Sequence, residues 1–208
     1  MKNNTNDKMK PVETLIEGSA KAHGHLCPGQ VIGVRMAVLG LELIGLSNPK
    51  ETSQIKKLIV YVEMDRCATD AISYVTGVTL GRRSLKFMDY GIMAATFVNL
   101  ETKKAFRILS LEKSRDLAKD YATGIEDNHL QQTKAYKIMP LSELFEVCEV
   151  QVNLHDSDMP GPSRYKAVCE KCQIVIRDRK EITRNGKILC HSCGLGGYYK
   201  NKSRIILT

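Results

Sequence analysis

Apolar residues recur at helical spacing near the start of the chain, and the pattern predicts two helices there. The first runs through "PVETLIEGSAKAHG", residues 11–24, with Pro11 suited to a first turn and Gly24 to a C-terminal stop. The second is apolar nearly all round over residues 31–46, and Pro28 fits its first position. A helix without a polar face has to be covered on all sides, so we expect the second helix at the centre of a domain.

The middle of the chain alternates between strand and helix patterns. "KKLIVYVEM", residues 56–64, is typical of a buried strand, and residues 67–76 repeat apolar positions helically up to Gly77. "MAATFVNLETKKAFRILSL", residues 93–111, alternates around a polar turn at 101–104 and predicts a β-hairpin. Further elements are expected as helices at 111–122, 126–138 and 142–147 and as a strand at 149–154. Strands and helices interleaved without a regular rhythm predict an α+β core, in which helices cover a mixed sheet.

A change in composition separates this core from the C-terminal part of the chain. The stretch "HDSDMPGPSR", residues 155–164, holds two prolines and a glycine and few apolar residues, which is typical of a linker. The core carries 20 Lys and Arg against 20 Asp and Glu, whereas the part from residue 164 carries 11 against 3, which accounts for the formal net charge of +8. We therefore predict two domains, residues 1–163 and 164–208, of which only the second is basic.

The C-terminal part has the cysteine spacing of a zinc finger. Cys169 and Cys172 form one CxxC pair, Cys190 and Cys193 form a second, and 17 residues separate the pairs. Each pair lets two thiolates from one tight turn reach one ion, and an Asn-Gly turn at 185–186 predicts a hairpin that returns the second pair to the first. A redox role or four unrelated thiols are the alternatives. We expect a four-cysteine zinc site that is chiefly structural, because so small a segment has too little core to fold alone.

Basic residues in the same segment raise the question of nucleic acid. Five of them lie on or beside the expected hairpin: Arg177, Arg179, Lys180, Arg184 and Lys187. Such a run is more often a solvated face, and neither interleaved aromatic residues nor a recognition-helix pattern accompanies it, so nucleic-acid binding is an alternative that we do not favour. His191, inside the second CxxC pair, is expected to be exposed.

His23, His25 and Cys27 fall within five residues, directly ahead of the second helix. Cys27 then lies at or near the N-cap, where free N–H groups and the helix dipole favour the thiolate that binds metals or attacks electrophiles. Cys67 is placed in the same way at the start of another helix, with Asp70 three residues on, where a capping carboxylate belongs. We expect the two helix starts to face one another across the carboxyl ends of the strands. They would form an N2S2 ligand set for a transition metal, or a three-ligand set with an open position.

The same residues also allow an enzyme. Cys27 or Cys67 would then be the nucleophile and His25 the base, while His23 and Asp70 would bind the substrate. A simpler alternative leaves the cysteines as small buried hydrophobic residues and the histidines as hydrogen-bonded side chains. Asp65 and Arg66 are either a helix cap and an ion pair or groups of the site. Cys148 is expected to be a core residue.

Three segments together resemble a known family. "HGHLCPGQVIGVRMA", "VEMDRCATDAISYVTGVTLG" and "MDYGIMAATF", in this order, are similar to the core domain of the E subunit of formylmethanofuran dehydrogenase (FmdE) and its relatives, over about residues 15–150. The segment from Cys169 to Cys193 resembles the treble-clef zinc finger found in some members. The resemblance implies an α+β core that pairs as a homodimer, with a cleft lined by residues of these motifs: His23, His25, Cys27, Cys67 and Asp70, with Asp89 and Tyr90 in the third motif. Many relatives have a cysteine where this chain has Val78, so a site that needs that thiol would be altered here.

The resemblance also implies a function. Formylmethanofuran dehydrogenase does its redox chemistry on a molybdenum or tungsten pterin and on iron–sulfur clusters in other subunits, and nothing in this sequence resembles a site for either. We therefore expect a zinc-containing, metal-binding accessory protein linked to one-carbon or molybdoenzyme metabolism, with subunits of such enzymes as partners. The polar start and the lack of a long apolar run predict a cytoplasmic protein without a membrane segment. Relatives occur apart from the pathway, so the resemblance alone does not imply a part in methanogenesis, and whether the chain is an enzyme stays open.

Overall fold

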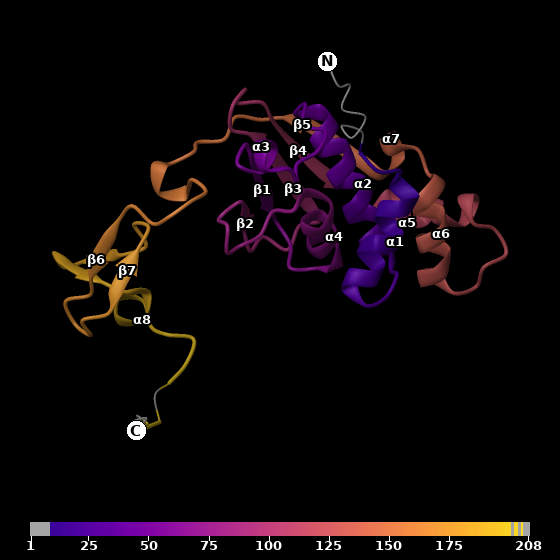
Figure 1. The fold of residues 1–208 in the computed structure, drawn as a ribbon. Helices are drawn as coiled ribbons and strands as arrows, with labels where there is room; N and C mark the ends of the chain where they lie inside the picture. The colour runs from indigo at the N-terminus through magenta and orange to yellow at the C-terminus, as the bar shows by residue number, and fades with distance from the viewer. Residues whose placement is uncertain (1–8, 201, 204, 206–208) are drawn as a thin grey trace, which may run out of the picture. The chain divides into compact units, whose positions relative to one another are not determined.

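The structure is a computed structural model that describes residues 9–200, 202–203 and 205, without the side chain of Thr52. Residues 1–8 lie outside the described residues. They make up most of the polar start on which the prediction of no targeting segment depends. The chain divides into two compact units, one up to Asn153 and one from Leu154 (Figure 1). The boundary that composition predicts, between residues 163 and 164, lies inside the second unit.

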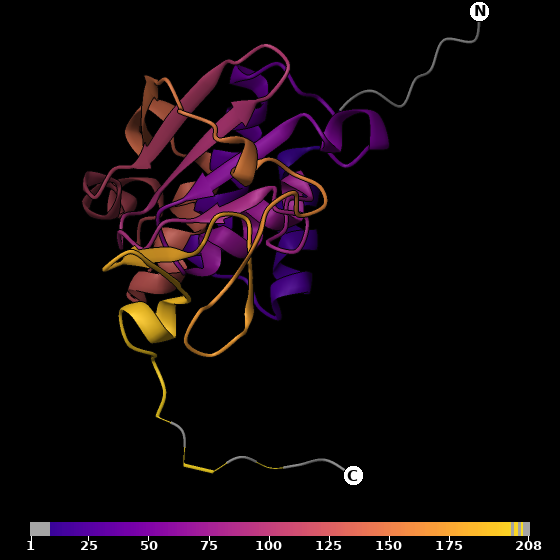
Figure 2. The same ribbon diagram turned by 90° about the vertical axis from the view of Figure 1, so that its left-hand side faces the viewer.

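A five-stranded sheet organises the first unit. Its strands are β1 (Leu58–Val62), β2 (Leu85–Phe87), β3 (Ala94–Asn99), β4 (Ala105–Ser110) and β5 (Phe145–Glu149). The order across the sheet is β2-β1-β3-β4-β5, in which β2 runs parallel to β1 and the other neighbouring pairs are antiparallel (Figure 2). The sheet is therefore mixed, as predicted, and the expected hairpin is its β3 and β4.

Helices cover this sheet in the same unit. They are α1 (Val12–His23), α2 (Pro28–Leu43), α3 (Thr52–Ile55), α4 (Cys67–Thr76), α5 (Lys113–Tyr121), α6 (Asn128–Ile138) and α7 (Leu141–Leu144). α2 packs against β3 and β4 of the sheet and also against α1, α4 and α6, which makes it the buried central helix that its sequence predicts (Figure 1). Within the described part of the chain, no helix combines the length and the apolar character that crossing a membrane requires.

Glycines determine where two of these helices end and how closely two of them approach. α1 ends at Gly24 (φ 102°) and α4 at Gly77 (φ 74°), in left-handed conformations that glycine adopts without strain. In α2, a Cβ atom on Gly33 would lie 2.5 Å from the carbonyl oxygen of Ala68 in α4. The two helix backbones are therefore in direct contact, which only a residue without a side chain permits at position 33.

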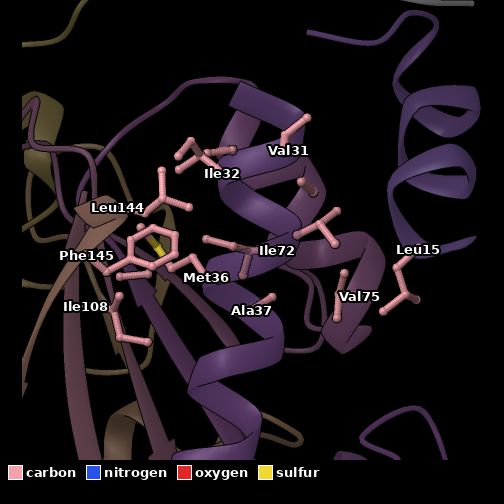
Figure 3. Close-up of a cluster of buried hydrophobic side chains, with 14 of the residues drawn as sticks. Leu15, Val31, Ile32, Met36, Ala37, Ile72, Val75, Ile108, Leu144 and Phe145 are labelled. Atoms are coloured by element: carbon pink, nitrogen blue, oxygen red, sulfur yellow. The ribbon is translucent and has the colours of Figure 1, made fainter. Parts of the chain in front are cut away.

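The hydrophobic core lies between the sheet, α2 and α4. Figure 3 shows Met36 of α2 on the side of Ile108 of β4, and Ile72 of α4 on the other side of α2. All three side chains are fully buried. Burial of each such side chain stabilises the fold by about 1.5–3 kcal/mol. The core therefore fixes the positions of α2 and α4 relative to the sheet.

The end of the first unit differs from the sequence-based expectation. The helix expected at 142–147 is the single turn α7, which ends at Leu144. The strand expected at 149–154 is wrong except at Glu149, because the strand β5 runs from Phe145 to Glu149 and residues 150–154 form none. Among the described strands β5 pairs with β4 alone, at the edge of the sheet. Its residues after Phe145 are exposed, Val147 and Cys148 included, so its apolar positions do not mark a buried face. Cys148, expected in the core, is exposed for the same reason.

The second unit consists of short elements. They are the 3-10 turn η1 (Asp156–Asp158), the strands β6 (Lys166–Val168), β7 (Val175–Arg177), β8 (Ile182–Arg184) and β9 (Lys187–Leu189), and the helix α8 (His191–Gly194). β6 and β7 pair on either side of the first CxxC, and β8 and β9 pair around the predicted Asn185-Gly186 turn. The helix that follows contains Cys193. A CxxC turn, a hairpin and a helix in this order have the arrangement of a treble-clef-type zinc finger, as expected.

Candidate metal centres

Three candidate ligands lie together where α1 leads into α2. His23 is the last residue of α1, Gly24 lets the chain turn, and Cys27 is the N-cap of α2. The ligand atoms of His23, His25 and Cys27 all lie within 4.8 Å of one another. Nitrogen and sulfur ligands of one tetrahedral ion are about 3.3–3.8 Å apart, so small side-chain rotations would bring these three onto one ion.

The two ring nitrogens of His23 have different surroundings. Nδ1 lies 2.9 Å from Oδ2 of Asp70 on α4, which accepts its proton in a hydrogen bond. Nε2 is buried, and among the described residues no hydrogen-bond partner reaches it. A histidine that binds a metal typically donates one N–H to a carboxylate and offers the other nitrogen to the ion. The donor set therefore fits a metal at Nε2 of His23.

Asp70 does not cap α4, contrary to the expectation from its place in the sequence. The N-cap of α4 is Arg66, and no side chain makes a capping hydrogen bond there. The carboxylate of Asp70 contacts His23 instead, because the packing of α1 against α4 brings the two side chains together. Asp65 and Arg66 are both exposed, and their ion pair is long, at 4.0 Å. Of the acidic residues near Cys67, Asp70 is thus the one that contacts a candidate ligand.

Cys67, the first residue of α4, lies beside Cys27 across Gly29. A Cβ atom on Gly29 would be 3.0 Å from Cβ of Cys67 and 3.7 Å from Sγ of Cys27. No side chain separates the two cysteines at this point, since residue 29 is glycine. The structure therefore brings the two helix starts together, with Cys67 next to the cluster of His23, His25 and Cys27.

Burial raises the pKa of the Cys67 thiol, and the hydrogen bond and the charge of Cys27 raise it further. The position of Cys67 at a helix start would by itself lower this pKa. The rise means that burial and the neighbouring sulfur outweigh the backbone hydrogen bond at Cys67, which lowers this pKa. A cation bound between the two sulfurs would displace the proton that they otherwise keep.

Other residues of the three motifs lie outside this cluster. Val78 follows the C-terminus of α4 and is fully buried in the core. The ten residues of α4 separate it from Cys67 by about 15 Å, so a valine there does not alter the cluster around Cys27. Asp89 and Tyr90 are exposed, in the loop after β2. A pocket next to the cluster is lined instead by residues of α1 and α4: Ser19, Ala22, His23, Asp70, Ser73 and Tyr74.

One residue beside the site was not anticipated from the sequence. Gln30 is fully buried in α2, and its side chain hydrogen-bonds both to Ser19 of α1 and to the carbonyl oxygen of Cys67. The only signal in the sequence is a single amide among the apolar residues at the start of α2. Such an amide has to find partners inside the protein, but the sequence does not say which ones.

The four cysteines of the second unit form a separate cluster. The ligand atoms of Cys169, Cys172, Cys190 and Cys193 all lie within 4.8 Å of one another, and Sγ of Cys172 lies 3.7 Å from Sγ of Cys190. Two sulfurs on one tetrahedral zinc are about 3.8 Å apart, given zinc–sulfur bonds of about 2.3 Å. The cluster therefore has the dimensions to hold a metal such as zinc. His191 is exposed, as expected.

The protonation of these four thiols is uneven. Backbone N–H groups, first that of Cys190, lower the pKa of Cys169 to about 6. The hydrogen bond with Cys190, followed by burial and by the other two thiols, raises the pKa of Cys193 to about 12. One sulfur is thus ready to bind a cation at neutral pH, while another keeps its proton until the cation arrives.

Fold and sites together define an α+β protein that has Cys and His groups suited to metal ions and a four-cysteine finger in its C-terminal unit. Residues 22–146 match the model of the family described as "FmdE, Molybdenum formylmethanofuran dehydrogenase operon". This match spans more than half of the chain and includes His23, His25, Cys27 and Cys67. The chain belongs to the FmdE family, as its motifs predict.

Individual proteins are also similar to the chain. One is a tungsten formylmethanofuran dehydrogenase FmdE-like protein from Syntrophus aciditrophicus, known from a crystal structure, with a TM-score of 0.57, 18% identity, and coverage of 91% of this chain and 95% of that one. At this identity the likeness shows the fold alone. Another is a "Probable S-adenosyl-L-methionine-binding protein" of Archaeoglobus fulgidus, 37% identical over 94 residues, which are 45% of this chain and 26% of that protein. The chain thus spans only about a quarter of that relative.

Proposed function

We propose that the chain is a metal-binding accessory protein with two sites, a structural zinc in the finger and a transition metal in the core. The core site would use His23, His25, Cys27 and Cys67 as ligands. The observation that supports it best is the buried Nε2 of His23, which lacks a hydrogen-bond partner among the described residues, on a histidine that forms a cluster with two other candidate ligands. An imidazole nitrogen held in this way by Asp70 is prepared for a cation.

Residues around this site have different roles. Asp70 orients the ring of His23 and fixes which nitrogen carries the proton. Gly29 keeps the space between Cys27 and Cys67 free of side chains. The softness of thiolate and the nitrogen of imidazole favour ions such as zinc, cobalt, nickel or iron over magnesium or calcium.

Metal analysis of the purified full-length protein tests this proposal. We expect two metal ions per chain in the wild type and in the control variant Cys148→Ser, whose thiol is exposed on β5. The variant Cys27→Ser should keep the finger zinc and lose the second ion. A wild type that holds a single ion, and loses it in Cys172→Ser, would contradict the core site.

A thiol-dependent enzyme is the second candidate, because His25 and Cys27 are in the same cluster. Cys27 would attack the substrate and His25 would take its proton. Cys67 is the weaker nucleophile, since its raised pKa favours the thiol at neutral pH. Rapid alkylation of Cys27 near neutral pH, in protein that holds no core metal, would support the enzyme. Slow alkylation together with a bound ion would exclude it.

Nucleic-acid binding through the finger is less well supported. Three of the basic residues beside the hairpin have partners inside the second unit: Arg179 stacks on Tyr165 at 4.0 Å, Lys180 is 3.4 Å from Asp158, and Arg184 donates to the carbonyl oxygen of Gly194 at 2.7 Å. Fewer cations are therefore available for phosphates than the sequence indicates. Salt-dependent binding to DNA or RNA that disappears when residues 164–208 are removed would support this role.

Membership of the FmdE family supports association with subunits of formylmethanofuran dehydrogenase type, and we propose such enzymes of one-carbon or molybdoenzyme metabolism as partners. A homodimer and a cytoplasmic location also stay predictions. Light scattering of the purified chain measures the first. Co-purification of the tagged chain with an enzyme subunit from its own cells tests the proposed partnership. Repeated failure to co-purify such a subunit would contradict the partnership and leave the proposed metal sites unaffected.

A further inference from the structure

The amide of Gln30 joins three helices. This side chain lies in the first turn of α2, three residues after Cys27, and is fully buried. Its Oε1 accepts a hydrogen bond from the hydroxyl of Ser19 on α1, and its Nε2 donates to the carbonyl oxygen of Cys67 on α4 at 2.6 Å. Both ends of the amide are therefore used, and each end reaches a different neighbouring helix.

Each of the three helices that Gln30 joins also carries a candidate ligand of the core site. α1 ends in His23, Cys27 caps α2, and α4 begins with Cys67. Where α2 faces α4 next to the site, its residue is Gly29, and one turn further on it is Gly33. The core holds α4 against α2 as a whole, but at these two glycines no side chain of α2 interlocks with α4. The hydrogen bond from Gln30 to Cys67 adds a directional restraint at this end of α4.

We infer that Gln30 is a positioning residue. It holds the first turn of α4 at the position along α2 that places the sulfur of Cys67 beside that of Cys27. The inference rests on the proposed function, because it concerns the ligands of the same core site. It goes further in naming a residue that contacts no ligand atom and yet sets the distance between two of them. A residue that served only the stability of the fold would not affect that distance.

Phenylarsine oxide measures whether the two sulfurs are in register, without any metal. Its arsenic condenses with two thiols: the arsenic–oxygen bond is replaced by two arsenic–sulfur bonds, and both thiol protons leave with the oxygen as one water. Arsenic stays trivalent, so no oxidant is needed. The reaction is strong only where both sulfurs reach one arsenic atom. In the full chain with zinc in the finger, the pair of Cys27 and Cys67 is the expected site, and peptide mapping identifies the cysteines that carry the adduct.

The variants are Gln30→Met and a matched control on the same helix. Arg35 of α2 also makes two hydrogen bonds, to the carbonyl oxygens of Tyr136 and Met139, both at 2.6 Å. Arg35→Met thus removes two bonds of α2 on the side of α6, away from the site. Gln30→Glu is a second probe, because a carboxylate still accepts from Ser19 but has no N–H to donate to Cys67.

Gln30→Met should bind the arsenical about tenfold more weakly than the wild type, in line with the effect of residues that orient ligands, while Arg35→Met should bind it as the wild type does. Gln30→Glu should resemble Gln30→Met. Should Gln30→Met not fold, Ser19→Ala, which removes only the anchor on α1, should still weaken arsenical binding. Equal affinities in the wild type and all folded Gln30 and Ser19 variants would overturn the inference.

Cobalt(II) added to the same proteins separates this inference from the proposed function. If the wild type binds the arsenical but no cobalt outside the finger, and Gln30→Met binds the arsenical more weakly, the proposed core metal fails and the positioning role stands. If the wild type binds cobalt in the core and Gln30→Met binds cobalt and arsenical equally well, the metal site stands and the positioning role fails. A changed absorption spectrum of the cobalt in Gln30→Met, at normal stability of the fold, supports both.

Discussion

His23 at the end of α1 and Asp70 in α4, which are 47 residues apart, share a hydrogen bond of 2.9 Å that determines how the imidazole is presented. The side chain of His23 has an exposed fraction of 16% and that of Asp70 one of 65%, so the charge of Asp70 faces solvent while the ring faces inward. The carboxylate makes the ring a stronger donor to a cation and keeps the proton on Nδ1. The orientation of a candidate ligand on α1, and the nitrogen that carries its proton, therefore depend on a residue of α4.

Asp70→Asn should lower the affinity of the core site for cobalt or zinc by about tenfold to a hundredfold. The amide oxygen still accepts from Nδ1, so the loss reports the charge and not the geometry. Competition with a chromophoric chelator measures the affinity, and Asp65→Asn is the control, because Asp65 is exposed and pairs with its neighbour Arg66. Equal affinities in the two variants would show that Asp70 does not act on the site.

Gly33→Ala should destabilise the first unit by about 1–3 kcal/mol, because the new methyl group would meet the backbone of α4 at Ala68. Urea denaturation measures the free energy of unfolding. Gly81→Ala is the control, since a Cβ there has no atom within 4 Å among the described residues. If both variants unfold at the same urea concentration, the close contact of α2 and α4 is not needed for stability.

Arg35→Met should cost about 2 kcal/mol in the free energy of unfolding. The guanidinium donates to the carbonyl oxygens of Tyr136 and Met139 at the end of α6, and methionine fills a similar volume but gives them no donor. Arg66→Met removes an exposed arginine and should change the stability little. Thermal unfolding followed by circular dichroism compares the two, and a loss of the same size in both would contradict the capping role of Arg35.

Stability should fall at alkaline pH, in part through Tyr136. Burial raises the pKa of this phenol above its ordinary value, although the hydrogen bond with Ser114 and the charge of Arg115 oppose the rise. The folded state therefore favours the protonated form, so its contribution is complete below about pH 10 and is lost as the pH rises through the folded-state pKa. Tyr136→Phe should reduce the alkaline loss in the free energy of unfolding, measured in urea between about pH 9 and pH 11. Tyr90→Phe, at a side chain with an exposed fraction of 60%, should leave the loss unchanged.

Removal of zinc should unfold the second unit and leave the first one folded. The finger has a small core of Cys169, Ile176 and Leu189, with too little buried area to fold without a metal. Amide hydrogen exchange after treatment with a chelator should show lost protection in β6 to β9 and unchanged protection in β1 and β3. Acid should act like the chelator, because the pKa of Cys193, raised to about 12, means that zinc has to displace a proton there. Persistent protection in the finger without metal would contradict a structural zinc.

Much of this fold could be predicted from the sequence because its elements carry local signals. Gly24 and Gly77 end α1 and α4, Pro28 begins α2, and the turn between β3 and β4 is polar between two apolar runs. Such signals depend on the backbone preferences of single residues, which act before any tertiary contact forms. β5 has no signal of this kind, since an exposed edge strand needs no pattern of burial, and its position follows only from pairing with β4.

The candidate sites divide in the same way. The sequence reveals the clustering of His23, His25 and Cys27 within five residues and the two CxxC pairs, because each of these groups lies on one short segment. The sequence does not reveal the contact of His23 with Asp70 or the hydrogen bonds of Gln30 to Ser19 and Cys67. These contacts require α1, α2 and α4 to pack at one particular position along each other's axes. No local preference fixes that position. It is set by the core, by the close contact at the glycines and, for the first turn of α4, by the hydrogen bonds of Gln30.

The edge of the sheet at β5 has a consequence for how copies of the chain meet one another. On the outer side of β5, backbone N–H and C=O groups pair with no described strand and are available to a strand of another molecule. Glu146 and Glu149 are exposed along this edge. Two such edges approaching in solution would place carboxylates near carboxylates and repel one another. The acidic pair thus works against the stacking of sheets into fibres, and its neutralisation by amides should make concentrated solutions of the protein aggregate sooner.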